Sequence, residues 1–332
     1  MIHFLPIEPL WQRYSEQWLR WFQREFERLN VPYKTWMGQH VGDIQTGQFL
    51  DVFGTHVFKF TQLARLIEAT QRGEGIKDGD TVFLMDVWFP GLEALAYIRD
   101  GAGIKFKIVG ILHDGSYDQH DFLYQKGMQN WAQHLEESWF QLLDQIYVGT
   151  LFHKGYVLAA RECDPEKIKV TGLPFFPEEC QASRIGSLRP FKVIFPHRPA
   201  KEKGPEHFDK LLAYTNLVGI RRHETVPAWP KDLYYRNLSR SEVAVSYAWQ
   251  EMFGISMLEA CANGCLPLVP NRLAYAEIYP DVFKYGPEEE SNLEPRILDL
   301  IARRAELEPL ARNVATKFTG AIENMVKSAL AV

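Results

Sequence analysis

Residues 251–270 read EMFGISMLEACANGCLPLVP, and they follow the apolar run EVAVS of residues 242–246. An apolar run, a short loop and a helical pattern in this order predict a strand that leads into a helix. Gly254 stands where the helix begins and Gly264 where it ends, as a C-cap glycine does. The second apolar run, residues 266–269, predicts a neighbouring parallel strand.

Two carboxylates bracket seven residues of this unit. Glu251 lies in the loop before the helix, and Glu259 lies inside the helix. Backbone amides at a helix N-terminus, unobstructed by a side chain at Gly254, suit a diphosphate. Carboxylates beside such a site bind sugar or ribose hydroxyls through charge-assisted hydrogen bonds. Taken alone, however, two glutamates on such a unit are more often solvated surface residues.

The remainder of the chain repeats the alternation of strand and helix. Apolar runs predict strands at residues 2–7, 81–88, 106–112, 145–148, 168–171 and 192–195. Helical spacing of apolar residues predicts helices at residues 14–29, 91–99, 127–143, 152–160, from 205, 253–262 and, as two amphipathic helices, 292–332. This order indicates an α/β protein whose parallel sheets carry helices on both faces.

A length of 332 residues favours two domains. We expect residues 1–175 to form the first, a turn-rich linker at 176–190, and residues 191–332 to form the second, with the closing helices. Ligands bind beyond the carboxyl ends of parallel strands, so two doubly wound, Rossmann-like domains are expected to face a central cleft.

Composition excludes several classes of protein. The chain is 46% hydrophobic and 24% charged, which is ordinary for a soluble globular protein, and its formal charge of −5 gives no bulk attraction to nucleic acid or an anionic membrane. No run approaches the ~18 apolar residues of a membrane helix. Four cysteines and the absence of a basic leader favour a cytoplasmic protein. Histidine and cysteine spacings predict no metal site, and no GxGxxG or P-loop occurs.

A basic loop follows the strand at 192–195. In VIFPHRPAKEKGPEHFDKLL, residues 193–212, Arg198 and Lys203 stand directly after the strand. A leaving nucleoside diphosphate gains negative charge as its bond to the sugar breaks, and fixed cations stabilise that charge.

Together these segments resemble retaining nucleotide-sugar glycosyltransferases of the GT-B architecture, particularly glycosyltransferase family 4, whose E-x7-E signature matches Glu251 and Glu259. VTGLPF, residues 170–175, resembles the crossing between the two domains of that family. The resemblance implies that Arg198 and Lys203 bind the donor diphosphate, without a metal or other cofactor. It further implies that Glu251 positions the donor sugar, that Glu259 holds the ribose, and that backbone amides of Phe253, Gly254 and Ile255 assist.

A narrower resemblance, over residues 233–280 and the loop FPHRPAKEKGPEHF, is to tRNA-queuosine mannosyltransferases. It suggests a modified nucleobase in tRNA or DNA as acceptor, while a small metabolite or a glycan remains open, as does the oligomeric state. The first half lacks the glycine-rich opening of those enzymes, so we expect a changed acceptor domain.

The first half offers its own candidates at predicted strand ends. His113 follows the strand at 106–112, and the family resemblance implies that it lies near the donor sugar, although a structural histidine in a turn is an equal alternative. The acceptor-side candidates are Glu8, Tyr14, Asp86, Trp88, Asp114 and Asp118.

Two other functions compete with the transferase. A nucleotide-sugar epimerase or hydrolase would consume donor without an acceptor, and a non-catalytic module would only bind a nucleotide or a glycan.

Overall fold

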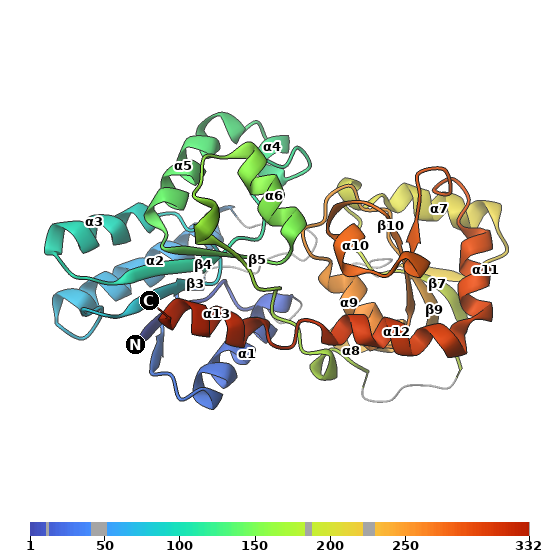
Figure 1. Cartoon of the computed structure of the whole chain (residues 1–332), viewed down its shortest axis with the longest axis horizontal. Coiled ribbons are helices and arrows are strands. Elements are labelled where there is room, and N and C mark those ends of the chain that lie inside the picture. Colours follow the sequence, from blue (N-terminus) through green and yellow to red (C-terminus); the bar gives the residue numbers. More distant parts are fainter. Residues whose placement is uncertain (11–12, 41–51, 183–187, 222–229, 332) are drawn as a thin grey trace. The chain divides into compact units, whose positions relative to one another are not determined.

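The computed structural model describes residues 1–10, 13–40, 52–182, 188–221 and 230–331. The chain forms two compact units (Figure 1): Met1–Pro174 together with Gly320–Val332, and Phe175–Thr319. Each unit is an α/β layer structure built on its own parallel sheet.

The first unit contains a sheet with the strand order β2-β1-β3-β4-β5-β6, in which every neighbouring pair is parallel. Because its inner strands are buried on both faces, they are continuous apolar runs such as TVFL and QIYV. The strands are β1 (Ile2–Leu5), β2 (Tyr33–Thr35), β3 (Thr81–Leu84), β4 (Lys107–Ile111), β5 (Gln145–Val148) and β6 (Ile168–Val170).

Helices cover both faces of this sheet. Aromatic side chains join the sheet to α1, where the Phe4 ring centroid lies 5.0 Å from that of Phe22 and 5.9 Å from that of Phe83. The helices of this unit are α1 (Tyr14–Arg28), α2 (Val52–Gln71), α3 (Leu92–Ala102), α4 (Phe122–Gln125), α5 (Gln129–Leu142), α6 (Leu151–Ala160) and α13 (Ala321–Leu330). Figure 1 shows α1 and α13 side by side, with α5 and α6 on the opposite face.

The second unit contains a parallel sheet with the order β11-β10-β9-β7-β8. Its strands are β7 (Phe191–Phe195), β8 (Gly219–Arg221), β9 (Ser241–Val245), β10 (Leu266–Pro270) and β11 (Lys284–Tyr285). Its helices are α7 (Pro205–Tyr214), α8 (Lys231–Ser239), α9 (Ile255–Ala262), α10 (Leu273–Ile278), α11 (Glu294–Ala302) and α12 (Arg304–Thr316). The helix predicted at 253–262 is thus confirmed as α9, between β9 and β10.

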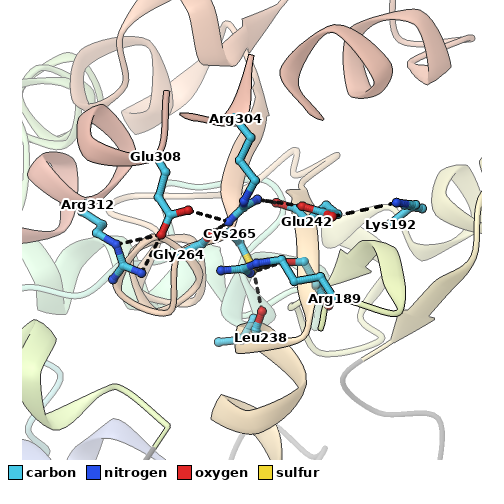
Figure 2. A network of polar contacts seen from close by, with 10 residues as sticks. Arg189, Lys192, Leu238, Glu242, Gly264, Cys265, Arg304, Glu308 and Arg312 are labelled. Carbon is cyan, nitrogen blue, oxygen red and sulfur yellow. Dashed lines mark hydrogen bonds and ion pairs between the residues drawn. The ribbon is translucent and has the colours of Figure 1, made fainter. Parts of the chain in front are cut away.

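Arginines of α12 fasten the C-terminal end of α9 (Figure 2). Arg304 pairs with Glu242 (2.9 Å) and Glu308 (3.0 Å) and donates to the carbonyl of Gly264. Arg312 donates to Glu308 (2.8 Å) and to the carbonyl of Ala262 (3.0 Å). Cations at a helix C-terminus satisfy its last carbonyls and interact favourably with its dipole, so this network holds α9 against β9 and α12.

The observed units differ from the predicted domain ranges in two places. The second unit begins at Phe175, which was expected in the first domain, and it includes residues 176–180, which were expected in the linker 176–190. The Cys180 carbonyl joins this segment to the end of α9, because it accepts a bond from Asn263 Nδ2 (2.7 Å). Residues 183–187 of that linker lie outside the described residues.

The second difference concerns the chain's end, where two helices were expected over residues 292–332. The described residues there form three helices, and the last of them, α13, joins the first unit. Its apolar face is buried, Glu323 pairs with Arg28 of α1, and Ser328 donates to Gln145 of β5 (2.7 Å). An amphipathic pattern predicts the helix but not which unit covers its apolar face.

The fully buried Met325 of α13 provides a test of this attachment. Met325→Ala should destabilise the first unit by about 2–5 kcal/mol, because it removes buried methylene groups and leaves a cavity. Leu330→Ala, at an exposed position of the same helix, should change stability by less than about 0.5 kcal/mol. Hydrogen exchange at the β1 and β3 amides measures the effect. Equal protection in both variants would contradict this packing.

Candidate functional site

The loop between β9 and α9 ends at Gly254, which has a φ of 89°. A side chain here would be strained, and a Cβ would lie 2.6 Å from Cε1 of the Tyr275 ring. Among the described residues, no side chain forms a capping hydrogen bond at the N-terminus of α9. The glycine thus lets α9 begin directly against Tyr275, and a helix N-terminus without a side-chain cap is an arrangement suited to an anion.

Glu251 is the centre of the polar contacts in front of α9. Its Oε2 accepts from Lys203 Nζ (3.3 Å) and from the hydroxyl of Tyr275 (3.4 Å), and its Oε1 accepts from the amide of Phe253 (3.3 Å). Burial and then the charge of Glu251 raise the pKa of Tyr275 well above its usual value, so this hydroxyl stays protonated and donates. Lys203 also donates to the carbonyl of Gln250. The structure therefore brings together Lys203 and Glu251.

A histidine that the sequence reasoning missed extends this network. His197 is buried at the end of β7, with Nε2 2.9 Å from Ser246 Oγ and Nδ1 3.0 Å from Ser256 Oγ in the first turn of α9. Ser246 donates to the Tyr275 hydroxyl (3.2 Å), so its oxygen accepts from His197 Nε2, and Nδ1 accepts from Ser256. The hydrogen bonds thus run in one direction, from α9 to Glu251. In the sequence, the position of His197 directly after the strand at 192–195 and before Arg198 is the signal that could have marked it as a site residue.

The other donor-side candidates occupy different settings. Arg198 NH2 lies 2.5 Å from Glu202 Oε1, one turn along the same loop, and the side chain is partly exposed. Glu259 is only 4% exposed, and its Oε1 accepts from the hydroxyl of Tyr235 (3.0 Å). Phe253 is buried against Phe318, with ring centroids 4.6 Å apart, so only its backbone can meet a ligand. Ile255, half-buried, is the first residue of α9.

His113 lies in the first unit, at the end of β4, against two aromatic rings. Its ring stacks on Tyr14 and Trp18, at centroid distances of 5.8 and 5.3 Å. Nε2 is 2.9 Å from the carbonyl of Met85 and must donate, so Nδ1, 3.4 Å from the Tyr14 hydroxyl, is the acceptor. Burial lowers the pKa of His113, which favours the neutral ring. Both nitrogens are thus engaged within the unit.

A buried lysine, which the sequence reasoning also missed, lies beside this histidine. Lys59 of α2 pairs with Asp86 (2.7 Å) and donates to the carbonyl of Trp88. The other oxygen of Asp86 accepts from the Trp88 amide (3.0 Å). Glu8 is buried and accepts from Thr55 Oγ1 of α2 (3.0 Å). No pattern marks Lys59, because α2 was not predicted from the sequence.

Trp88 is held by a second buried ion pair. Its Nε1 donates to Glu136 (3.1 Å), which is completely buried and pairs with Arg161 (2.9 Å). Glu136 also accepts from the amide and the hydroxyl of Ser116 (2.5 and 2.8 Å). These contacts fix the indole of Trp88 to the loop that follows β4.

Asp114 and Asp118 shape this loop. Asp114 accepts from the amide of Gly115 (2.8 Å), and the buried Asp118 accepts from the amide of His120 (2.8 Å). Burial raises the pKa of the neighbouring Asp121 to about 6. The acceptor-side candidates thus lie on the loops after β1, β3 and β4, except Tyr14, which is the first residue of α1, whereas the donor-side residues all belong to the second unit.

Among the described residues, no group of three or more His, Cys, Asp or Glu side chains is arranged to hold a metal ion. Within the same ranges, no helix has the length and apolar character needed to span a bilayer.

Comparison with known proteins identifies the architecture. No protein-family model matches the chain. Among solved structures, sucrose-phosphate synthase from Thermosynechococcus elongatus is 11% identical with a TM-score of 0.69, over 99% of this chain and 96% of that one. HepE from Anabaena, in complex with UDP and glucose, is 13% identical with a TM-score of 0.64, over 99% of both chains. The chain therefore has the predicted GT-B fold.

A sequence match exists to a curated protein. Over 50 residues, which are 15% of this chain, it is 44% identical to the tRNA-queuosine alpha-mannosyltransferase of Drosophila melanogaster. The match spans only 13% of the fly protein's length.

The buried His153 provides a pH test of the loop after β4, because its Nε2 lies 2.7 Å from the hydroxyl of Tyr117. Burial lowers the pKa of His153 to about 3, below the unfolded value of about 6.5. Between these two pKa values the unfolded chain binds a proton at His153 that the folded protein does not. The contribution of His153 to the stability of the folded protein is therefore complete above pH 6.5 and is lost as the pH falls toward 3.

His153→Gln should therefore make the free energy of unfolding less dependent on pH between 6 and 4, by up to about 1.4 kcal/mol per pH unit. Denaturant titrations at several pH values measure this slope. The control is His134→Gln, at an exposed position of α5. An unchanged slope in His153→Gln would show that this ring is not held neutral.

Proposed function

We propose that the chain is a glycosyltransferase that moves a sugar from a nucleoside-diphosphate sugar to an acceptor hydroxyl with retention of configuration. The observation that carries this proposal is the meeting of Lys203 and Glu251 in front of the uncapped N-terminus of α9. A cation and open amides suit a diphosphate, and a carboxylate beside them suits sugar hydroxyls. The GT-B fold and the local match to a mannosyltransferase support the same assignment.

The departing nucleoside diphosphate is the group that needs stabilising as the glycosidic bond breaks. Lys203 supplies a point charge, and Arg198, which is paired with the carboxylate of Glu202, supplies a planar guanidinium that can bind two phosphate oxygens. The amides around Gly254 and Ile255 add the positive end of the α9 dipole. In this proposal the protein's own cations take the role of a metal, so no step is assigned to a metal or other cofactor.

Glu251 and Glu259 hold the two ends of the donor. Glu251, which accepts bonds from Lys203 and Tyr275, contacts the donor sugar, and the hydrogen-bonded chain from His197 keeps its carboxylate in one orientation. Glu259 lies further along α9, on the side of the ribose. In this proposal His113, whose neutral ring stacks on Tyr14, is a catalytic candidate beside the reacting centre.

The acceptor in this proposal is a modified nucleobase in tRNA or DNA. The local identity to a tRNA-queuosine alpha-mannosyltransferase supports it. An epimerase or hydrolase acting on the same donor is the alternative, and it would release nucleoside diphosphate or an altered sugar nucleotide at an undiminished rate when the acceptor is omitted.

Donor binding is tested by thermal unfolding with UDP, GDP, ADP, TDP and CMP. We expect one nucleotide to raise the melting temperature by several degrees, since a ligand at ~100 times its Kd adds about 2.7 kcal/mol. UDP is the first choice, because HepE was solved in complex with it. Arg198→Ala should abolish the shift. Arg236→Ala, which breaks a looser and more exposed i,i+4 pair with Asp232 on α8, should retain it. A wild-type protein that none of these nucleotides stabilises would contradict the proposal.

Turnover tests the role of Glu251. Glu251→Gln should lower kcat about 10²- to 10³-fold, because it removes a preorganised charge at the reacting sugar. Release of nucleoside diphosphate in the presence of acceptor measures the rate. Glu288→Gln, at an exposed position in the same unit, should have no effect. A wild-type rate in Glu251→Gln would place the sugar site elsewhere.

A further inference from the structure

An exposed tryptophan stands next to the candidate donor site. Trp249 lies in the loop between β9 and α9, two residues before Glu251, and 44% of its surface is exposed. The guanidinium carbon of Arg272 lies 3.8 Å from the centroid of its ring. A contact this close covers one face of the indole, so its exposed surface comprises the opposite face and the edges.

The arginine beneath the indole is itself held rigidly. Arg272 donates to the carbonyls of Ala248 and Tyr247 (both 3.1 Å) and forms a two-pronged ion pair with Glu290 (2.9 and 3.1 Å). The residue that follows, Leu273, has a φ of 57°, which is an unusual conformation for a bulky side chain. Strained residues persist only where the surroundings enforce them, and they cluster at functional sites. The indole therefore rests on a fixed support and would lose little freedom on binding a ring.

Trp249 is also tied to the loop that carries the donor-side cations. Its amide donates to the carbonyl of Glu202 (2.8 Å), and the carboxylate of Glu202 pairs with Arg198. The same loop ends at Lys203, which contacts Glu251. The backbone of Trp249 is thus hydrogen-bonded to the loop whose cations are proposed to bind the diphosphate.

The position of Trp249 beside Glu251 indicates which part of the ligands the indole meets. The two residues are two positions apart, so their Cα atoms lie within ~7 Å of each other. In the proposed function Glu251 contacts the donor sugar, whereas Glu259 holds the ribose. The indole is therefore expected on the sugar side, where the acceptor hydroxyl must approach.

We propose that the indole of Trp249 is a stacking surface for a nucleobase of a nucleic-acid acceptor. The inference rests on the proposed function, because it takes the direction of the donor from it. A flat base can extend the stack of the Arg272 guanidinium and the indole, and aromatic side chains commonly bind unpaired bases in this way. Such stacking accepts any base, so it supplies affinity, while the contacts that select one base lie elsewhere.

Fluorescence anisotropy with a fluorescein-labelled single-stranded RNA octamer of mixed sequence, at one fixed salt concentration, tests the proposal. Trp249→Ala should weaken binding about 5- to 100-fold, as expected for the loss of one stacked base. Trp249→Phe keeps an aromatic face and should stay within about 5-fold of the wild type. Tyr214→Ala removes an aromatic side chain that is 86% exposed at the end of α7, and it should have no effect. The DNA octamer of the same sequence distinguishes the two sources of the base.

The outcomes separate this inference from the proposed function. UDP, or whichever nucleotide stabilises the wild type, should protect Trp249→Ala equally, which also shows that the variant is folded. Loss of nucleotide binding in Trp249→Ala would assign the indole to the donor and overturn the proposal. It is equally overturned if the wild type binds neither octamer, or if Trp249→Ala binds them as the wild type does. In either case, nucleotide stabilisation that Arg198→Ala abolishes would leave the transferase proposal standing.

Discussion

The close approach of Gly254 to the Tyr275 ring is the constraint on which the candidate donor site depends. At a φ of 89°, with a Cβ position only 2.6 Å from that ring, any other residue would be strained and would force the Tyr275 ring and the start of α9 apart. This contact sets where α9 begins, and it brings the Tyr275 hydroxyl to Glu251. One backbone conformation thereby positions the first amides of α9, the carboxylate and its hydrogen-bonded partners together.

The opposite end of α9 is held by charge. Arg304 and Arg312 of α12 bind carbonyls at the helix end and share Glu308, while Arg304 also reaches Glu242 of β9 (Figure 2). Cations are favourable at this end for the same reason that a diphosphate is favourable at the other, because both complement the helix dipole. A helix of eight residues is short, so fixed contacts at both ends are what give it a defined direction.

The first unit places its polar groups differently, as buried ion pairs. The first pair is Lys59 with Asp86, and the second is Arg161 with Glu136. Both pairs form hydrogen bonds with Trp88, and Glu136 also bonds Ser116 in the loop that carries His113. Such pairs add little net stability, because desolvation offsets their attraction, but removing one partner leaves an uncompensated buried charge. Their effect here is to hold each loop in one conformation, with the Trp88 indole bonded to Glu136 and the Trp88 amide to Asp86.

The sequence by itself determined the alternation of strands and helices, because apolar periodicity and glycine positions are local signals. It also showed the strand–loop–helix segment that carries Glu251 and Glu259, and the basic loop of Arg198 and Lys203. It did not reveal the edge strands β2 and β8, because each has only three residues and these are partly exposed. It also did not reveal α2, which brings Lys59 to Asp86. The tertiary structure alone decided that His197 joins Ser246 to Ser256, that Arg272 supports Trp249, and that α13 packs on the first unit. These contacts join residues from 23 to 295 positions apart, and no pattern within one segment encodes which distant surface will cover it.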